Sequence, residues 1–138
     1  MVTADYDAWT RQVIDTFRTQ GGEVPQFGRT LVLVHHIGAR SGVERIAPVR
    51  AFPDGDGWLI VASKGGAPQN PAWYYNLLAQ PDVTIETPDD GDVEVHVTQL
   101  DPDARAAAWE RITSEAPGFA DYEQRTTRTI PVLKLTRR

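Results

Sequence analysis

Hydrophobic residues recur near the start of the chain at intervals close to the 3.6-residue repeat of an α-helix. They are Tyr6, Trp9, Val13, Ile14 and Phe17. Gly21-Gly22 is a natural C-terminal stop. We therefore expect an amphipathic helix over residues 5–20. Such a helix packs across the end of a barrel, or it lies on a membrane surface or over a site as a lid.

The pattern then changes to strand-like segments. Residues 30–37, 43–52 and 58–63 are apolar and rich in β-branched side chains, and turn-forming residues fill 38–42 and 53–57. Two consecutive antiparallel hairpins are expected. Leu31-Val32-Leu33-Val34 is continuously apolar, which favours a strand that is buried on both faces.

The second half of the chain alternates helices and strands. Asn70 as N-cap and Pro71 as first helical residue predict a helix over 71–79. Residues 83–87 and 93–97 form a third predicted hairpin, and Asp101-Pro102 repeats the cap-then-proline signal before a helix over 105–115. Pro117-Gly118 ends that helix, and a loop through Tyr122 leads to a last strand over 130–135.

These elements predict an α+β fold that is mainly β. We expect one domain over residues 1–138, with 1–27 as the N-terminal helix and lead-in and 28–135 as the core. About six mostly antiparallel strands with three flanking helices favour a small barrel, because closure leaves no exposed strand edges.

Composition narrows the function. The 138 residues carry a net charge of −5, which disfavours binding to nucleic acid. There is no Cys, so disulfides, thiol nucleophiles and Cys-bound metals are excluded, and a cytoplasmic location is expected. The basic residues Arg40, Arg45, Arg50 and Lys64 form a group sized for one small anionic ligand.

Two glycine-containing segments are candidates for binding that anion. Residues 38–42 place Arg40 and Ser41 in a turn, where backbone N–H, guanidinium and hydroxyl groups can bind phosphate or carboxylate. An ordinary solvent-exposed turn is the alternative. The second segment, Ser63-Lys64-Gly65-Gly66, follows a strand and precedes a helix N-terminus, but it lacks the spacing of a P-loop or a dinucleotide fingerprint.

Aromatic residues offer a wall for a planar ring. Trp73, Tyr74, Tyr75, Phe119 and Tyr122 form this set, although helical spacing places two or three of them in the core. Neighbouring residues on a strand point to opposite faces, so His35 and His36 do not suit one metal ion, and no metal site is expected. No residue pattern indicates a catalytic triad.

The segments together resemble the deazaflavin (F420)-dependent nitroreductase family of actinobacteria, a group of F420H2-dependent quinone, nitro and enone reductases. The resemblance rests on Gly38 to Pro48, on Ser63-Lys64-Gly65-Gly66 through Trp73-Tyr74-Tyr75-Asn76-Leu77, and on residues 119–126. It covers residues 28–135. It implies a split β-barrel, similar to FMN-binding proteins, that holds reduced coenzyme F420 as hydride donor.

The resemblance also implies roles for individual residues. Ala39, Arg40 and Ser41 would meet the anionic tail of the cofactor, helped by Arg45 and Lys64. The ring pocket would be lined by Ile46, Ala47, Pro48, Val61, Ala62, Ser63, Ala72, Trp73, Tyr74, Tyr75 and Asn76. Phe119 and Tyr122 would border a flat, electron-poor acceptor, with Tyr122 as hydrogen-bond donor to the acceptor and Ser63 as partner of the ring.

The chain departs from the family pattern at two positions. Ala39 replaces a second basic residue of many relatives, and Phe119 replaces a Tyr of some. The alternatives are a non-catalytic barrel that binds a cofactor, tetrapyrrole or lipid, and an FMN enzyme on the same fold. A monomer or homodimer is expected, with the N-terminal helix as a possible peripheral membrane contact.

Overall fold

The alternating pattern produces a closed antiparallel barrel. A computed structural model describes residues 6–138. The strands follow the order β1-β2-β3-β6-β5-β4 around the barrel, and β4 pairs with β1 to close it. Their bounds are β1 (Leu31–Ile37), β2 (Glu44–Asp54), β3 (Gly57–Val61), β4 (Asp82–Thr87), β5 (Gly91–Gln99) and β6 (Val132–Arg137). The expected mainly-β barrel of six antiparallel strands is confirmed.

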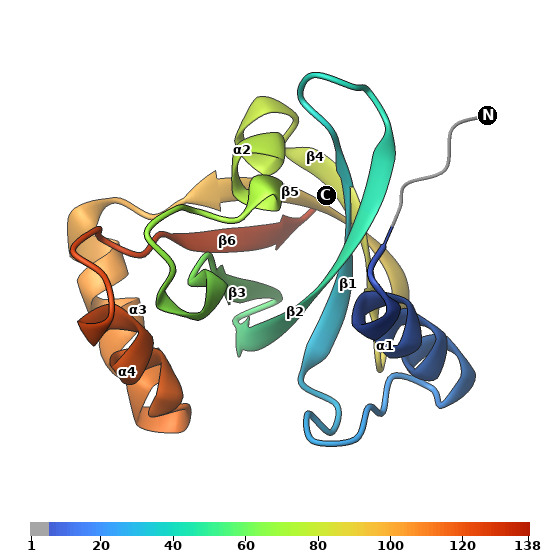
Figure 1. Cartoon of the computed structure of the whole chain (residues 1–138), viewed down its shortest axis with the longest axis horizontal. Helices are drawn as coiled ribbons and strands as arrows, with labels where there is room; N and C mark the ends of the chain where they lie inside the picture. Colours follow the sequence, from blue (N-terminus) through green and yellow to red (C-terminus); the bar gives the residue numbers. More distant parts are fainter. Residues whose placement is uncertain (1–5) are drawn as a thin grey trace.

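Four α-helices and one 3-10 turn flank the barrel within residues 6–138. They are α1 (Ala8–Thr19), η1 (Lys64–Gly66), α2 (Ala72–Ala79), α3 (Pro102–Glu115) and α4 (Gly118–Gln124). Figure 1 shows α1 on one side of the barrel and α3 with α4 on the opposite side. The short helix α2 lies at the end of the barrel where the β1–β2 hairpin turns.

Strand β1 is buried on both faces, as its continuous apolar run predicts. Val32 and Val34 belong to the cluster inside the barrel. Leu31 and Leu33 point the other way and pack with Val13, Ile14 and Phe17 of α1. The helix therefore covers the outside of β1, which confirms its packing role against the barrel.

The helix boundaries follow their caps, with two corrections. Asp101 accepts a hydrogen bond from the backbone N–H of Ala104, as the cap-then-proline signal predicts. Pro71, and not Asn70, is the N-cap residue of α2. Helix α1 begins later than expected, after an Asp7 cap, and the expected start at residue 5 lies outside the described residues.

The predicted loop through Tyr122 is wrong. Residues 118–124 form α4, and Pro117 is its N-cap residue rather than part of a helix stop. Helix α3 has already ended at Ala116, whose N–H bonds the carbonyl of Ile112. Phe119 and Tyr122 lie three positions apart, so both can pack against the cluster beneath α3 and α4.

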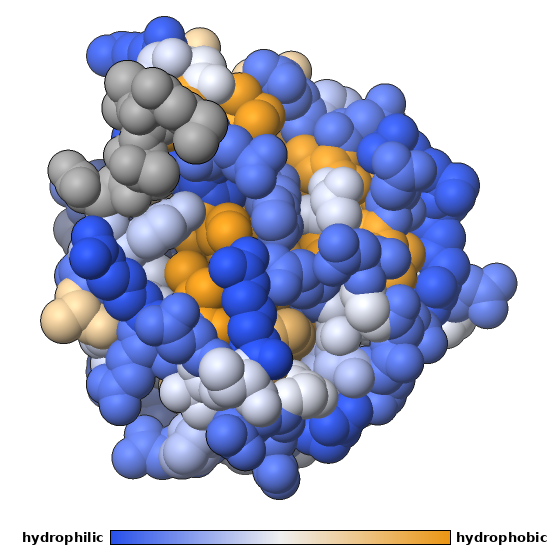
Figure 2. Space-filling model, turned by 90° about the vertical axis from the view of Figure 1, so that its right-hand side faces the viewer, coloured by the Kyte–Doolittle hydropathy of each residue, from blue (hydrophilic) through white to orange (hydrophobic). Residues whose placement is uncertain are grey.

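The side of the molecule that includes α1 shows, over the described residues, no broad apolar surface. Figure 2 shows small hydrophobic patches that are separated by hydrophilic residues. Trp9 is 57% exposed and its ring packs edge-on against Phe27. None of the helices within residues 6–138 has the length and apolar character that crossing a bilayer requires.

Candidate cofactor and acceptor site

A pocket lies between the turn of the β1–β2 hairpin and helix α2. Its volume is about 560 Å³. It is lined by Gly38, Ala39, Arg40, Ser41, Arg45, Ala72, Tyr75 and Asn76. The fold thus brings the predicted anion-binding turn against the predicted Trp-Tyr-Tyr-Asn helix, two segments that are far apart in the sequence.

The turn is shaped by its glycines and by one hydroxyl. Gly42 has φ +70°, a left-handed conformation that favours glycine. The Gly38 N–H donates to the carbonyl of Val43 over 2.9 Å, and the Ser41 hydroxyl oxygen accepts from the Val43 N–H over 3.2 Å. These bonds fix the conformation of the loop. Arg40 is exposed, and its side chain lines the pocket.

The pocket is electropositive. Within residues 6–138, no carboxylate lies within 4.0 Å of the Arg40 or Arg45 guanidinium. Most other arginines of the barrel surface are paired, including Arg18 with Glu86 and Arg137 with Asp90. Two guanidinium groups without a carboxylate partner suit a phosphate or carboxylate.

Asn76 joins the turn to the helix. Its Oδ1 accepts from the Ala39 N–H over 2.9 Å, and its Nδ2 lies 3.0 Å from Nδ1 of His36. Burial, together with the nearby charges of Arg45 and His35, lowers the pKa of His36 to about 4. His36 is therefore neutral at pH 7, and its Nδ1 accepts the hydrogen bond from Asn76.

The glycine-rich segment after β3 lies beside α4. Val61, Ala62 and Ser63 are buried, whereas Lys64 is exposed at the start of η1. A Cβ atom on Gly66 would lie 2.7 Å from the backbone oxygen of Tyr122, and Gly66 has φ +83°. Only glycine fits this close approach, which places Tyr122 next to the segment that carries Ser63.

Arg128 holds this segment in place. Its Nη2 donates to the Ser63 carbonyl over 2.7 Å, and its Nε donates to the Ala67 carbonyl over 2.9 Å. Its Nη1 donates to Ala62 O over 3.2 Å and to Asn70 Oδ1 over 2.7 Å. One guanidinium thus binds four acceptors spread from residue 62 to residue 70. No local sequence signal identifies Arg128, because its partners lie about sixty positions earlier.

The aromatic residues divide between core and site. Tyr74 is buried in the barrel core and its hydroxyl donates to Gln99 over 2.7 Å, while Trp73 packs against the same core. Tyr75 is exposed and faces the pocket. Phe119 contacts Tyr122 edge-on at a ring-centroid distance of 5.5 Å.

The remaining predicted ring residues lie on β2. Ile46, Ala47 and Pro48 pair with β1 and are half-buried. They follow Arg45 directly and thus lead from the pocket towards the middle of the barrel wall. The structure brings the turn together with α2, and it brings the segment that carries Ser63 together with Tyr122.

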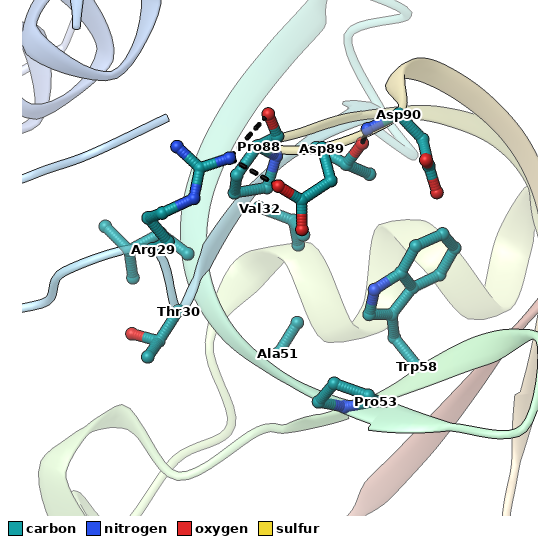
Figure 3. Close-up of a pocket in the computed structure, with 11 residues that line it drawn as sticks. Arg29, Thr30, Val32, Ala51, Pro53, Trp58, Pro88, Asp89 and Asp90 are labelled. Atoms are coloured by element: carbon teal, nitrogen blue, oxygen red, sulfur yellow. Dashed lines mark hydrogen bonds and ion pairs between the residues drawn. The ribbon is translucent and has the colours of Figure 1, made fainter. Parts of the chain in front are cut away.

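A second pocket, of about 240 Å³, lies at the opposite end of β1 and β2. Figure 3 shows Val32, Ala51 and Trp58 around it, with Arg29 and Asp89 at its rim. Arg29 donates to the carboxylate of Asp89 and to the carbonyl of Pro88. These charges are used within the protein, and no residue of this pocket was expected to bind a ligand.

The histidines have structural partners. His35 Nε2 lies 2.7 Å from Glu86 and Nδ1 lies 2.9 Å from Glu44, while His96 bonds Asp82. Burial alone would raise the pKa of Glu86, but hydrogen bonds from Arg18 and His35 lower it overall. Residues 6–138 contain no group of three or more His, Cys, Asp or Glu that could hold a metal ion.

Known proteins share this sequence pattern and this fold. The family model described as F420H(2)-dependent quinone reductase matches residues 9–137. An F420H(2)-dependent quinone reductase of Mycobacterium tuberculosis is 42% identical over 110 residues, which cover 78% of this chain and 73% of the relative.

Two solved structures are similar. A structure described as F420-H2 dependent reductase FDR-A has a TM-score of 0.69 and 32% identity, covering 78% of this chain and 94% of its own. A chain described as a domain-swapped dimer has a TM-score of 0.72 and 31% identity, covering 92% and 96%. The resemblance noted in the sequence therefore extends over the whole barrel.

Proposed function

This chain belongs to the F420H(2)-dependent quinone reductase family, and on that premise we propose that its barrel binds reduced coenzyme F420 and reduces a quinone. Family membership makes the chain a deazaflavin-dependent oxidoreductase. The individual site residues and the range of acceptors beyond quinones are part of the proposal.

One observation carries the proposal: the pocket beside α2 holds two unpaired arginines. F420 has an anionic phosphate-containing tail and a flat ring, and a ligand of this kind fits a positive pocket that continues along β2. Arg40 and Ser41 would bind the tail where the turn passes Ala39, with Arg45 inside the pocket. The side chain of Ala39 is small, so this position contributes space rather than charge.

The ring would lie along β2 and the segment after β3. Ile46, Ala47 and Pro48 would contact one part of it, and Ser63 would hydrogen-bond it. Ser63 is only 8% exposed, and within residues 6–138 its hydroxyl has no hydrogen-bond partner, so it is free to bond a ligand. Arg128 fixes the backbone of this segment before any ligand arrives, which reduces the entropy lost on binding.

Bound reduced F420 supplies a hydride, and the protein's residues then have to orient the acceptor and stabilise negative charge on its oxygen. Tyr122 would donate such a hydrogen bond. The packing of its backbone on Gly66 and of its ring on Phe119 supports this role, because both contacts hold the side chain in one position. We infer that quinones are the main acceptors and that activated alkenes and nitro compounds react as well, because these are also flat and electron-poor.

Peripheral membrane contact through α1 stays a prediction. The apolar residues Val13, Ile14 and Phe17 already face the barrel, which leaves exposed Trp9 as the main apolar group for a lipid surface. A cytoplasmic location, and a monomer or homodimer, are likewise expected. Flotation with liposomes, comparing the protein with Trp9→Ala, tests the membrane contact directly.

The function is tested by mixing the protein with reduced F420 and recording the return of the oxidised chromophore. The panel contains a quinone, an enone and a nitroaromatic. Quinone-dependent oxidation well above the rate without protein is the expected result. Binding of F420 without turnover of any acceptor would favour the carrier alternative, and a protein that purifies with FMN would favour the flavin enzyme.

A further inference from the structure

Arg50 lies on the outer face of the barrel wall. Side chains alternate along a strand, so Pro48, Arg50 and Phe52 of β2 point to the same side. Arg50 pairs with Leu31 of β1, whose side chain packs outside the barrel beneath α1. Phe52 belongs to the cluster beneath α3 and α4. Arg50 therefore stands between the two helical layers that flank the barrel.

Its guanidinium has no polar partner among residues 6–138. The carbon of the guanidinium lies 5.1 Å from the centre of the Phe52 ring, and the Nε atom is buried without a hydrogen-bond partner. In the part of the chain from residue 6 onward, no carboxylate lies within 4.0 Å of it. A buried donor without an acceptor is unfavourable, and an oxyanion is the ligand that best relieves it.

Arg50 lies close to the aromatic residues that are proposed to border the acceptor. Phe52 contacts Phe119 at a centroid distance of 5.8 Å, and Phe119 contacts Tyr122. Pro48 is two residues away on the same face of β2, roughly 7 Å along the strand. Arg50 thus lies between the residue proposed to contact the cofactor ring and the aromatic residues proposed to border the acceptor.

We propose that the Arg50 guanidinium binds an anionic oxygen of the acceptor, so that negatively charged quinones are the preferred substrate class. This inference rests on the proposed function. Arg50 acts by charge and hydrogen bonding alone, and no bond forms or breaks at it. The anionic tail of the cofactor is the other source of such an oxygen, and a pair of matched acceptors distinguishes the two sources.

The test uses 1,4-naphthoquinone-2-sulfonate and the uncharged 2-methyl-1,4-naphthoquinone. The Arg50→Gln variant should lower kcat/KM for the sulfonate by roughly ten- to a hundredfold, the size expected for a lost hydrogen bond to a charged group. Its kcat/KM for the uncharged quinone should change by less than about threefold. Arg50→Lys should restore part of the loss, because it keeps the charge without the planar fork.

Direct binding provides a readout that needs no turnover. Calorimetric titration of the sulfonate into the protein with oxidised F420 should give a weaker affinity for Arg50→Gln than for wild type, by about the same factor. The fluorescence of F420 itself reports cofactor affinity, which should stay unchanged. Arg11→Gln removes a positive charge from the exposed face of α1 and should alter neither titration.

The outcomes separate the two proposals. If Arg50→Gln weakens F420 binding and affects both quinones equally, Arg50 serves the cofactor and the inference is wrong. Equal kcat/KM losses on the two quinones with normal F420 binding would also overturn it. If wild type reduces neither quinone, the proposed function fails, and the calorimetric comparison still decides whether Arg50 binds the anion. Circular dichroism of each variant establishes that the barrel is folded.

Discussion

The Nδ2 atom of Asn76 lies 3.0 Å from Nδ1 of His36, a contact that connects α2 to β1 beneath the candidate anion pocket. The same amide accepts the N–H of Ala39. Asn76→Leu leaves the buried Nδ1 of His36 and the N–H of Ala39 without partners, so we expect a loss of about 1–3 kcal/mol in the free energy of unfolding. We also expect weaker F420 binding.

Urea unfolding and F420 fluorescence titration measure these two effects. Leu78→Ala, on the exposed side of α2, is the matched control and should change cofactor affinity little. An Asn76→Leu protein with wild-type affinity for F420 would show that the turn keeps its shape without this amide.

The depressed pKa of His36 predicts a pH dependence of stability. The pKa is about 4 in the folded protein against the ordinary histidine value of 6.5, mainly because of burial. Between these values the unfolded chain binds more protons, so stability is full above pH 6.5 and falls as the pH approaches 4. His36→Gln should flatten this part of the curve of unfolding free energy against pH. A curve of unchanged slope would contradict the assignment.

Replacement of Arg128 should loosen the segment that carries Ser63. Arg128→Met removes four hydrogen bonds at once, and Arg128→Lys can replace at most part of them. We expect Arg128→Met to lose about 2–4 kcal/mol of stability, because several carbonyl groups lose their partner. Arg128→Lys should lie between Arg128→Met and wild type.

A purely structural role for Arg128 would lower stability without changing ligand binding at low temperature. We expect Arg128 to affect F420 binding as well as stability. At a temperature where every variant is folded, F420 affinity should fall in the order wild type, Arg128→Lys, Arg128→Met. The protection of the backbone N–H groups of residues 64–70 against hydrogen exchange should fall in the same order. Equal affinities in all three would limit Arg128 to stability.

The unpaired arginines of the pocket should govern the salt dependence of cofactor binding. Arg40→Gln together with Arg45→Gln should weaken F420 binding by roughly a hundredfold, about tenfold for each charge-assisted contact. The affinity of the double variant should also fall less steeply with added salt. Arg11→Gln again serves as the control. An unchanged affinity would move the anion site away from this turn.

Tyr122→Phe tests the proposed hydrogen bond to the acceptor. The ring stays against Phe119, so cofactor binding should be preserved while kcat/KM for quinone, enone and nitroaromatic acceptors falls by roughly tenfold or more. Steady-state kinetics with each acceptor measure this. Turnover that is unchanged for all three acceptors would mean that water, and not Tyr122, supplies the hydrogen bond.

Periodicity in the sequence was sufficient for most of the barrel, and its failures have specific causes. The alternation of apolar residues located each strand to within a few positions, and the apolar run from Leu31 to Val34 predicted burial on two faces. Helix α4 is not predicted because its apolar stripe consists of only the partly buried Phe119 and Tyr122 and because Pro117-Gly118 looks like a stop. Short helices offer too little periodic signal.

Long-range partners could not be predicted. Asn70 is a residue type that often caps a helix, but its Oδ1 accepts a hydrogen bond from Arg128 instead. Only the fold reveals this competing partner. Arg50 looked like one member of a basic group, whereas the structure places it apart from Arg40, on the face of β2 that carries Phe52. The two glycine-containing segments and the Trp-Tyr-Tyr helix were located correctly because local composition determines such turns and caps.

The dependence of the Ser63 segment on Arg128 bears on how the protein is made. Strand β3 pairs with β2, which directly precedes it, but its other neighbour, β6, and the guanidinium that fixes residues 62–70 come much later in the chain. A nascent chain that has reached only β5 therefore has an open barrel, and its residues 62–70 lack the hydrogen bonds from Arg128. The segment that carries Ser63 reaches its final structure only after the residues from Arg128 through β6 have left the ribosome.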